Sequence, residues 1–215
     1  MSSPRGLQTN AQTGRPGRRK VRIHMRASPE DLARDLRREA RDGLSAKQKW
    51  VSSKWFYDKR GSELFAEITR LPEYYPTRCE RQILQAESHS IAAATRAETM
   101  IELGCGTSEK THLLLDAFTR SGSLLKFVPF DVDEATLREA AGTLMERYPH
   151  LEVEGIVGDF ERHLNALSDG ERTLIAFLGS TIGNLVEGKR RAFLSGLSRS
   201  LKPGDGFLLG ADLVK

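Results

Sequence analysis

The sequence predicts an α/β fold with a doubly wound, mainly parallel sheet and helices on both faces. From Thr99 onward, short apolar runs alternate with amphipathic segments, which is the pattern of strands and helices in such a sheet. A Gly-x-Gly turn, Gly104-Cys105-Gly106, directly follows the first of these apolar runs. Right-handed crossovers then favour the strand order 3-2-1-4-5.

Helices are expected before this alternating part. The first follows a capping residue, Ser28, with proline at its first position, and we expect Gly43 to end it. A short amphipathic helix is expected from Ser62 to Leu71. A second capping box, Thr77-Arg-Cys-Glu80, is expected to begin a long helix that runs to about Ala97.

The alternating part is divided into strands and helices as follows. The expected strands are Met100–Leu103, Lys126–Phe130, Glu152–Val157, Thr173–Leu178 and Phe207–Gly210. The helices between them lie near Lys110–Phe118, Glu134–Tyr148, Arg162–Leu167 and Lys189–Leu201, and Asp133 is a suitable N-cap for the second. Residues 99–215 are therefore expected to form the core, and residues 28–98 a helical segment that contributes to a pocket.

Charge is distributed unevenly along the 215 residues. The net charge is +4, but residues 1–27 carry seven basic residues and no acid, so the remainder is mildly acidic. The basic leader is rich in Gly, Pro, Ser and Thr, so we expect it to be disordered and dispensable for ligand binding. An acidic body suits a small-molecule enzyme and argues against nucleic acid as a partner.

The apolar segments and the cysteines of the sequence indicate the cellular compartment of the protein. The chain has neither an apolar signal segment nor a run of about 20 apolar residues, which argues against secretion and membrane insertion. Its two cysteines, Cys79 and Cys105, form no CxxC motif, so we expect a reduced compartment and no structural zinc. We therefore expect a cytoplasmic protein, and we separately expect it to be a monomer.

Candidate binding residues follow the expected strands, at the edge where open α/β sheets bind ligands. Glycines at positions 104 and 106 let a ligand approach the backbone closely. The third glycine of a dinucleotide fingerprint would stand at position 109, which is Glu109, so a ligand without a pyrophosphate fits better. The small-residue loop from Gly179 to Asn184 opens at the same edge.

Acidic residues end two of the strands. Asp131 lies 27 residues beyond the first glycine and can accept hydrogen bonds from both ribose hydroxyls. Asp159 offers a carboxylate to an adenine amino group, and Phe160 a ring beside its face. Taken alone, an ordinary strand-end acid with a core phenylalanine would be the better interpretation, but three such loops opening at one edge favour binding. A metal pair of Asp131 and Asp133 is disfavoured because Asp133 is better suited to cap a helix, so no metal is expected.

These motifs resemble those of class I S-adenosylmethionine methyltransferases: Glu-Leu-Gly-Cys-Gly-Thr, Phe-Asp-Val-Asp, Gly-Asp-Phe and Leu-Gly-Ser-Thr-Ile-Gly-Asn. The aromatic stretch is more specific. Lys-Trp-Phe-Tyr-Asp-Lys-Arg-Gly-Ser-Glu-Leu-Phe and Leu-Pro-Glu-Tyr-Tyr-Pro-Thr-Arg resemble the N-terminal signature of the L-histidine Nα-methyltransferases of ergothioneine biosynthesis. The resemblance covers roughly residues 28–215 and implies a Rossmann-like methyltransferase sheet.

The resemblance also implies roles for individual residues. Gly104 and Lys110 would meet the methionine end of S-adenosyl-L-methionine, Asp131 its ribose, and Asp159 with Phe160 its adenine. In the substrate half, Tyr57 would stand near the amine of L-histidine and serve as the catalytic residue. Tyr74 would lie near the imidazole, and Gly179 with Asn184 near the amino and carboxylate groups. The alternative interpretation is that both tyrosines are ordinary half-buried residues and that Lys110 is a solvated helix residue.

The implied reaction is threefold methylation of the histidine α-amine to hercynine. The chain ends where the family continues through another helix and strand pair, so the resemblance implies a truncated enzyme with little or no activity alone. We expect a version extended through its natural reading frame to be active. Two other interpretations are a related N-methyltransferase of another amino acid or amine and a non-catalytic cofactor-binding module.

Overall fold

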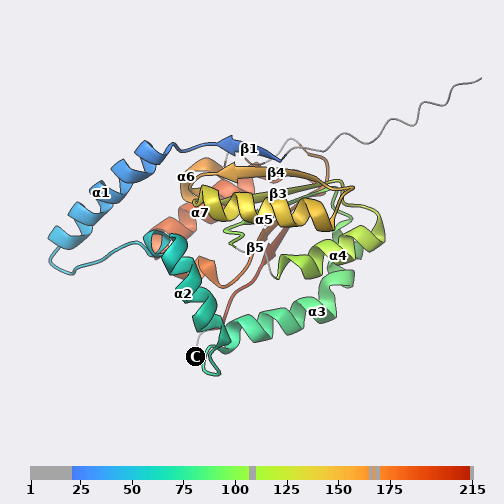
Figure 1. Ribbon diagram of the computed structural model, residues 1–215, viewed down its shortest axis with the longest axis horizontal. Coiled ribbons are helices and arrows are strands. Elements are labelled where there is room, and N and C mark those ends of the chain that lie inside the picture. The colour runs from blue at the N-terminus through green and yellow to red at the C-terminus, as the bar shows by residue number, and fades with distance from the viewer. Residues whose placement is uncertain (1–20, 107–109, 165–166, 168–169, 214–215) are drawn as a thin grey trace, which may run out of the picture.

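The computed structural model describes residues 21–106, 110–164, 167 and 170–213, which fold around one parallel sheet (Figure 1). Its strands are β1 (Arg22–Met25), β2 (Thr99–Leu103), β3 (Lys126–Asp131), β4 (Glu152–Val157), β5 (Thr173–Phe177) and β6 (Gly206–Leu209). They lie in the order β1-β4-β3-β2-β5-β6, and every neighbouring pair is parallel. The predicted α/β class and the predicted order of the last five strands are therefore confirmed.

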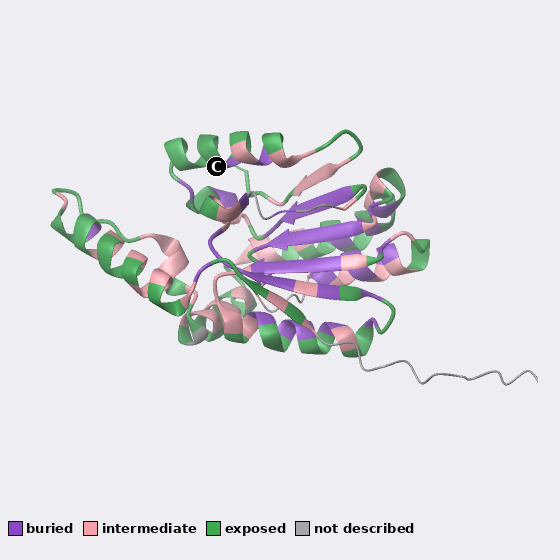
Figure 2. Ribbon diagram, turned by 90° about the horizontal axis from the view of Figure 1, so that it is seen from above, coloured by how far each residue is buried: buried purple, intermediate pink, exposed green. Residues whose placement is uncertain are grey.

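Helices surround this sheet. They are α1 (Pro29–Ser45), α2 (Lys59–Arg70), α3 (Tyr75–Thr95), α4 (Thr111–Ser121), α5 (Glu134–Arg147), α6 (Phe160–His163) and α7 (Glu187–Ser200). Single turns of 3-10 helix, η1 (Ser53–Phe56) and η3 (Thr181–Asn184), lie in the loops. Figure 2 shows the buried strands at the centre of the molecule, whereas α1 extends away from the body and is largely exposed.

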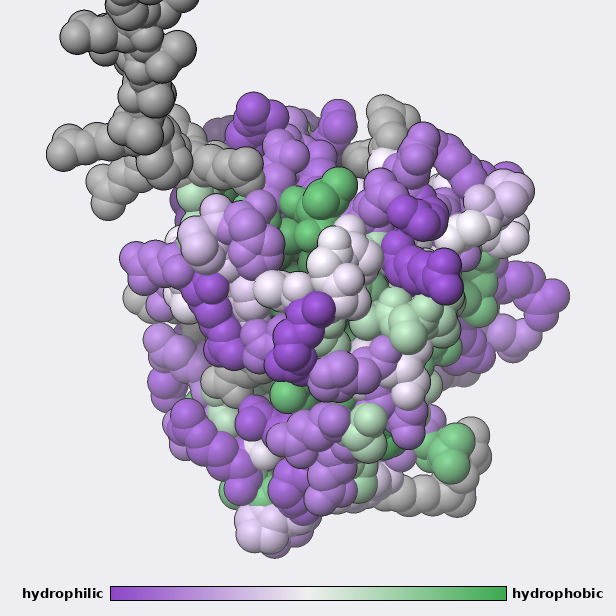
Figure 3. Space-filling view, turned by 90° about the vertical axis from the view of Figure 1, so that its right-hand side faces the viewer, coloured by the Kyte–Doolittle hydropathy of each residue, from purple (hydrophilic) through white to green (hydrophobic). Residues whose placement is uncertain are grey.

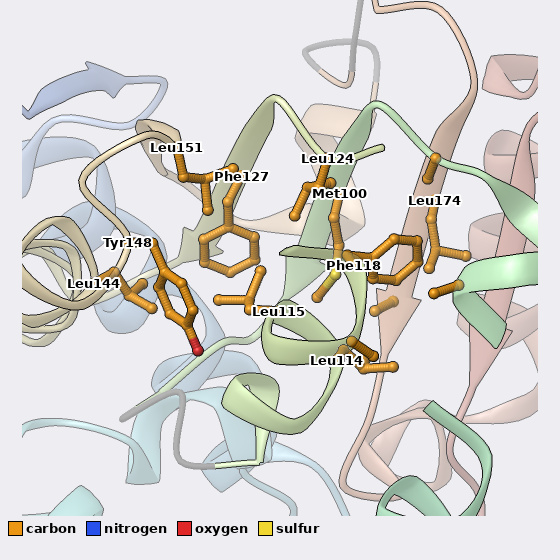
Figure 4. Packing of buried hydrophobic residues seen from close by; sticks show 14 of the residues in the cluster. Met100, Leu114, Leu115, Phe118, Leu124, Phe127, Leu144, Tyr148, Leu151 and Leu174 are labelled. Atoms are coloured by element: carbon orange, nitrogen blue, oxygen red, sulfur yellow. The ribbon is translucent and has the colours of Figure 1, made fainter. Parts of the chain in front are cut away.

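The core has one layer on each face of the sheet, because successive strand residues point to opposite faces. Met100 of β2 packs with Leu84 of α3 and Phe118 of α4, and Figure 4 shows Phe118 beside Met100 in this layer. The next residue, Ile101, belongs to the opposite layer, together with Phe193 of α7. The helices on both faces thereby hold the carboxyl ends of the central strands in place.

The leader predicted to be disordered through residue 27 is ordered in its last part. Residues 22–25 form β1, which pairs with β4 in parallel register from Arg22 opposite Glu154. The Arg22 guanidinium donates to the Glu154 carboxylate over 2.9 Å. Most of this strand is exposed, and its polar-apolar alternation, Arg-Ile-His-Met, covers only four residues beside the basic leader, which makes it a weak signal. The expected dispensability of the leader for ligand binding stays a prediction, and residues 1–20 lie outside the described residues.

Several helix boundaries differ from the predicted ones. Helix α1 has the predicted Ser28 capping box but continues past Gly43 to Ser45. Gly43 is buried within the helix, where a Cβ atom would lie 2.1 Å from the Trp50 carbonyl oxygen. Glycine is thus required there by the close approach of another segment. Helix α2 begins at Lys59, before the predicted Ser62, because the Asp58 carboxylate caps it.

The helix predicted near Arg162–Leu167 also begins earlier. Helix α6 starts at Phe160, because the Asp159 carboxylate accepts the Glu161 N–H over 2.9 Å and so serves as the N-cap. Helix α5, in contrast, has Asp133 as its N-cap, as predicted. Residues 165–166 of the predicted segment lie outside the described residues.

The capping box predicted at Thr77 is wrong. Helix α3 begins at Tyr75, with Pro76 in its first turn, and its N-cap residue Tyr74 makes no side-chain capping bond. Glu80, assigned to that box, instead pairs with Lys110 and the backbone of Gly179. The local pattern of a hydroxyl followed by a glutamate was thus outweighed by long-range partners.

The register of the strands brings their carboxyl ends to one edge of the sheet. Leu103 of β2 lies opposite Phe130 of β3, and Asp131 lies opposite Val157 of β4. These ends point toward α1 and α2, on the left of Figure 1. The opposite end of the molecule, seen in Figure 3, is mostly hydrophilic with small separate hydrophobic patches.

Candidate functional site

A cleft of about 610 Å³ lies at the carboxyl edge of the sheet. Loops that follow β2, β3, β4 and β5 form its floor, and η1, α2 and α3 contribute its walls. Seven of the nine predicted site residues line it: Tyr57, Gly104, Lys110, Asp131, Phe160, Gly179 and Asn184. Tyr74 and Asp159 are not among the residues that line the cleft.

The loop after β2 is fastened to the neighbouring strand. The Gly104 N–H donates to the Phe130 carbonyl over 2.8 Å, and the Gly106 N–H donates to an Asp131 carboxylate oxygen over 3.0 Å. Gly104 has a φ of +68°, a conformation that favours glycine. Position 109, where a dinucleotide fingerprint would have its third glycine, lies outside the described residues.

Asp131 stands at the end of β3 as a carboxylate held by the backbone. One oxygen accepts the Val132 and Asp133 N–H groups over 2.7 and 3.2 Å, and the other accepts that of Gly106. Burial raises the pKa of Asp131, and these three backbone bonds oppose the rise. The side chain is therefore held in one orientation at the cleft.

The two residues predicted to contact an adenine, Asp159 and Phe160, follow β4 but differ in their position relative to the cleft. The Phe160 ring lines the cleft and packs edge-on against Phe177, with 5.2 Å between ring centroids. The Asp159 carboxylate is buried and accepts a hydrogen bond from the Lys54 ammonium over 2.9 Å. Lys54 itself lines the cleft and also binds Glu39 of α1 over 2.8 Å.

This ion-pair cluster joins the N-terminal segment to the sheet. Hydrogen bonds to Glu39 and Asp159 raise the pKa of Lys54 even though burial, the largest single effect, lowers it. The ammonium is therefore charged and balances the buried Asp159 carboxylate and the half-buried Glu39 carboxylate. Because Lys54 and Tyr57 belong to one short segment, the cluster fixes that segment relative to the end of β4.

A second ion-pair cluster includes Lys110, which lines the cleft. The Lys110 ammonium, at the start of α4, pairs with Glu80 of α3. Glu80 also accepts the Gly179 N–H over 2.7 Å. Gly179 therefore lines the cleft with its N–H already bonded, and the following 3-10 turn carries Thr181 and Asn184 to the same wall.

Aromatic rings form the wall contributed by the N-terminal segment. Tyr57 and Phe65 line the cleft and pack edge-to-face with 5.7 Å between centroids. Tyr74 packs against the same Phe65 ring at 5.9 Å rather than facing the cleft. Burial, followed by the nearby Tyr57 and Glu80, raises the pKa of Tyr74. Its hydroxyl therefore stays protonated at neutral pH.

Sequence reasoning missed Lys54, Phe65, Glu80 and Glu102 as members of this site. Lys54 and Phe65 lie within the aromatic stretch, and their place in that motif was the available signal. Glu80 was assigned to a cap, and its contacts to residues 110 and 179 are not visible in the sequence. Glu102 could have been found as a lone acid within an otherwise apolar strand.

Glu102 is buried at the carboxyl end of β2 and lines the cleft. Burial raises its pKa to about 8, while a hydrogen bond from the Thr111 hydroxyl, 2.5 Å away, and the nearby Lys110 ammonium lower it. The folded protein thus keeps this proton up to about pH 8, whereas the unfolded chain loses it near 4.5. The free energy of unfolding must therefore fall as the pH rises through this window.

Replacing Glu102 with glutamine should remove this pH-dependent fall in the free energy of unfolding. The amide is neutral at every pH, and its oxygen can still accept a hydrogen bond from the Thr111 hydroxyl. We expect the unfolding temperature of Glu102→Gln to rise by a few degrees relative to the wild type between about pH 5 and about pH 9. Thermal unfolding followed by circular dichroism measures the difference. A difference that does not change with pH would show that Glu102 is ionised in the folded protein.

Among the described residues there is neither a metal site nor a membrane-spanning helix. No group of three or more His, Cys, Asp or Glu side chains within them could hold a metal ion. No helix in the described part of the chain is long and apolar enough to cross a membrane.

Comparison with known proteins places the chain in a family. Residues 36–215 match the family described as histidine-specific methyltransferase, SAM-dependent. The chain is 54% identical over 180 residues to the histidine N-alpha-methyltransferase of Mycobacterium tuberculosis, covering 84% of this chain and 56% of that protein. Its identity to the enzyme of the same name from Mycolicibacterium smegmatis is 53% over 186 residues, covering 86% and 58%.

A more distant relative and a solved structure agree. Ergothioneine biosynthesis protein 1 of Schizosaccharomyces pombe is 37% identical over an alignment of 196 residues, covering 86% of this chain and 24% of that protein. The fold resembles that of magnesium protoporphyrin IX methyltransferase from Synechocystis PCC 6803, solved with bound SAH. The TM-score is 0.51 at 15% identity over 69% of this chain and 66% of that one.

The chain spans 56–58% of the length of the two mycobacterial proteins. Its match to the family model nevertheless extends from residue 36 to residue 215 and includes both the aromatic segment and the sheet motifs. The chain belongs to the family of histidine-specific, SAM-dependent methyltransferases.

Proposed function

We propose that the cleft binds S-adenosyl-L-methionine and that the protein methylates the α-amino group of L-histidine three times, giving hercynine. The observation that carries this proposal is the convergence of four strand-end loops and an aromatic wall on one cleft. Its volume of about 610 Å³ lies within the usual range for small-molecule sites. Family membership and the names of the mycobacterial relatives support the substrate.

The cofactor would lie along the edge of the sheet. In this arrangement Lys110 and the Gly104 loop face its methionine end, and Asp131 accepts hydrogen bonds from its ribose. Phe160 lies beside its adenine. Asp159 would reach the adenine amino group from its ion pair with Lys54, so Lys54 belongs to the same subsite.

The main task of the protein is to position the substrate amine relative to the methyl group of the cofactor. When bound, S-adenosyl-L-methionine supplies a sulfonium methyl group that is already activated for transfer. The Tyr57 and Phe65 rings would exclude water beside the reacting amine, while Asn184 and the Gly179 loop orient the amino-acid group. Correct orientation alone can lower a barrier by about 7–11 kcal/mol.

A neutral amine is required for attack, so a proton must leave it. The Tyr57 hydroxyl, on the cleft wall, would orient the amine or pass its proton onward, directly or through water. Tyr74 contacts Phe65 instead of the cleft, so its role beside the imidazole stays a prediction. The same holds for the assigned roles of the other site residues.

Mass spectrometry of the reaction products tests the proposal. The chain is incubated with S-adenosyl-L-methionine and L-histidine, beside the M. tuberculosis relative as a positive control and with other amino acids as alternative substrates. From the protein in its natural reading frame we expect mono-, di- and trimethylhistidine, and from the 215 residues alone little or none, as the family resemblance implies. Methylation of another amino acid in preference to histidine would contradict the substrate assignment.

Other expectations stay predictions. They are the monomeric state, the cytoplasmic location, the absence of a nucleic-acid partner and the division of the chain into a leader, a helical segment and a core. The acidic body that remains beyond the basic leader supports a small-molecule substrate rather than nucleic acid.

A further inference from the structure

Glu80 lies where four elements meet beside the cleft. Its carboxylate pairs with the Lys110 ammonium at the start of α4 and accepts the Gly179 N–H, after β5, over 2.7 Å. Only 15% of its side chain is exposed, although it extends from the surface helix α3. The carboxylate is therefore held by two different partners in a mostly buried position.

The segment after β6 also packs against this carboxylate. A Cβ atom at Gly210 would lie 2.0 Å from the nearer Glu80 oxygen and 3.2 Å from the Leu178 Cα atom. Glycine at position 210 thus leaves the space that the carboxylate occupies. An alanine there would displace Glu80 without changing any charge, which offers an independent test of its position.

The pairing has a direct consequence for the cleft. Lys110 and Gly179 both line it, and the Lys110 ammonium would lie 3.6 Å from a Cβ atom at position 179. A lysine side chain has four rotatable bonds and loses considerable freedom when it is fixed. Glu80 fixes it before a ligand arrives, which lowers the entropy lost on binding.

We infer that Glu80 is a positioning residue: it holds the Lys110 ammonium against the Gly179 loop and so forms the subsite for the amino-acid end of the cofactor. This inference rests on the proposed function. Glu80 is not among the residues that line the cleft, so it acts through Lys110 and Gly179. Its loss should weaken recognition of the amino and carboxylate groups but not of the nucleoside.

Two ligands separate these effects. S-adenosylhomocysteine carries the amino-acid end, whereas 5′-methylthioadenosine has the same nucleoside and sulfur without it. Glu80→Gln keeps an oxygen acceptor for the Gly179 N–H and removes the charge opposite Lys110. By calorimetry, we expect it to bind S-adenosylhomocysteine about ten-fold more weakly and 5′-methylthioadenosine within about two-fold of the wild type.

A double-mutant cycle with Lys110 tests whether Glu80 acts through the Lys110 ammonium. Glu80→Gln should cause no further loss of S-adenosylhomocysteine affinity in a Lys110→Met background, because the two residues act as one unit. Gly210→Ala should reproduce the selective loss by displacing the carboxylate. Glu87→Gln, on the exposed part of the same helix, is the matched control and should bind both ligands like the wild type.

The outcomes are distinguishable. Equal weakening of both ligands by Glu80→Gln and Gly210→Ala would indicate general damage to the fold and overturn the inference. Unchanged affinity for S-adenosylhomocysteine in both variants, or independent effects in the cycle, would also overturn it while leaving the proposed function intact. A folded wild type that binds neither ligand would overturn the proposed function and this inference together.

Discussion

Replacing Asp131 with alanine should weaken the binding of S-adenosylhomocysteine about ten-fold or more. Hydrogen bonds that involve a charged group are worth about 1.5–3 kcal/mol, and this carboxylate lines the cleft at the end of β3. Since the nucleoside is affected, 5′-methylthioadenosine should lose affinity as well, unlike the selective effect expected at Glu80. Isothermal titration calorimetry measures both ligands.

The control must separate binding from folding, because the same carboxylate accepts three backbone N–H groups. Circular dichroism and thermal unfolding show whether the variant is folded. Asp42→Ala, on the exposed surface of α1, removes an acid far from the sheet edge and should bind like the wild type. Equal ligand binding by a folded Asp131→Ala variant would remove Asp131 from the site.

In a version of the protein extended through its natural reading frame, replacing Tyr57 with phenylalanine should slow methyl transfer to histidine by a factor on the order of 100. A positioned hydroxyl that orients the amine or relays its proton contributes about that much or more. The ring packing against Phe65 survives the change, so cofactor affinity should stay within about two-fold. The rate of methylhistidine formation, measured by mass spectrometry at saturating cofactor, checks the prediction.

Tyr148→Phe is the matched control for this change. It also removes one hydroxyl, but Tyr148 lies at the end of α5, where its hydroxyl donates to Asp116 over 2.6 Å. This variant should lose stability and keep its transfer rate at a temperature where it is folded. A Tyr57→Phe variant that transfers methyl groups as fast as the wild type would leave the Tyr57 hydroxyl without a role in the reaction.

The sheet could be predicted because its signals are local and repeated. Each central strand is a short apolar run, and the Asp133 cap lies directly before its helix. β1 escaped prediction because its alternation of Arg, Ile, His and Met is only four residues long, adjoins the basic leader and includes no buried residue. Its position depends on pairing with β4, more than 100 residues away.

The site could be predicted in outline for a related reason. Residues at the ends of parallel strands must meet at one edge, so Gly104, Asp131 and Phe160 were expected together and all line the cleft. Asp159 and Tyr74 follow the same motifs but face Lys54 and Phe65. Which way such a side chain turns depends on partners from distant elements, and no local pattern specifies them.

A crystal structure of the protein with S-adenosylhomocysteine tests the central claim most directly. We predict that the ligand lies in the cleft with its ribose hydroxyls about 3 Å from the Asp131 carboxylate and its adenine beside Phe160. Its amino-acid end should lie at Lys110, which still pairs with Glu80. A ligand bound outside this cleft, or reversed so that its adenine lies at Lys110, would contradict the assignment of the site.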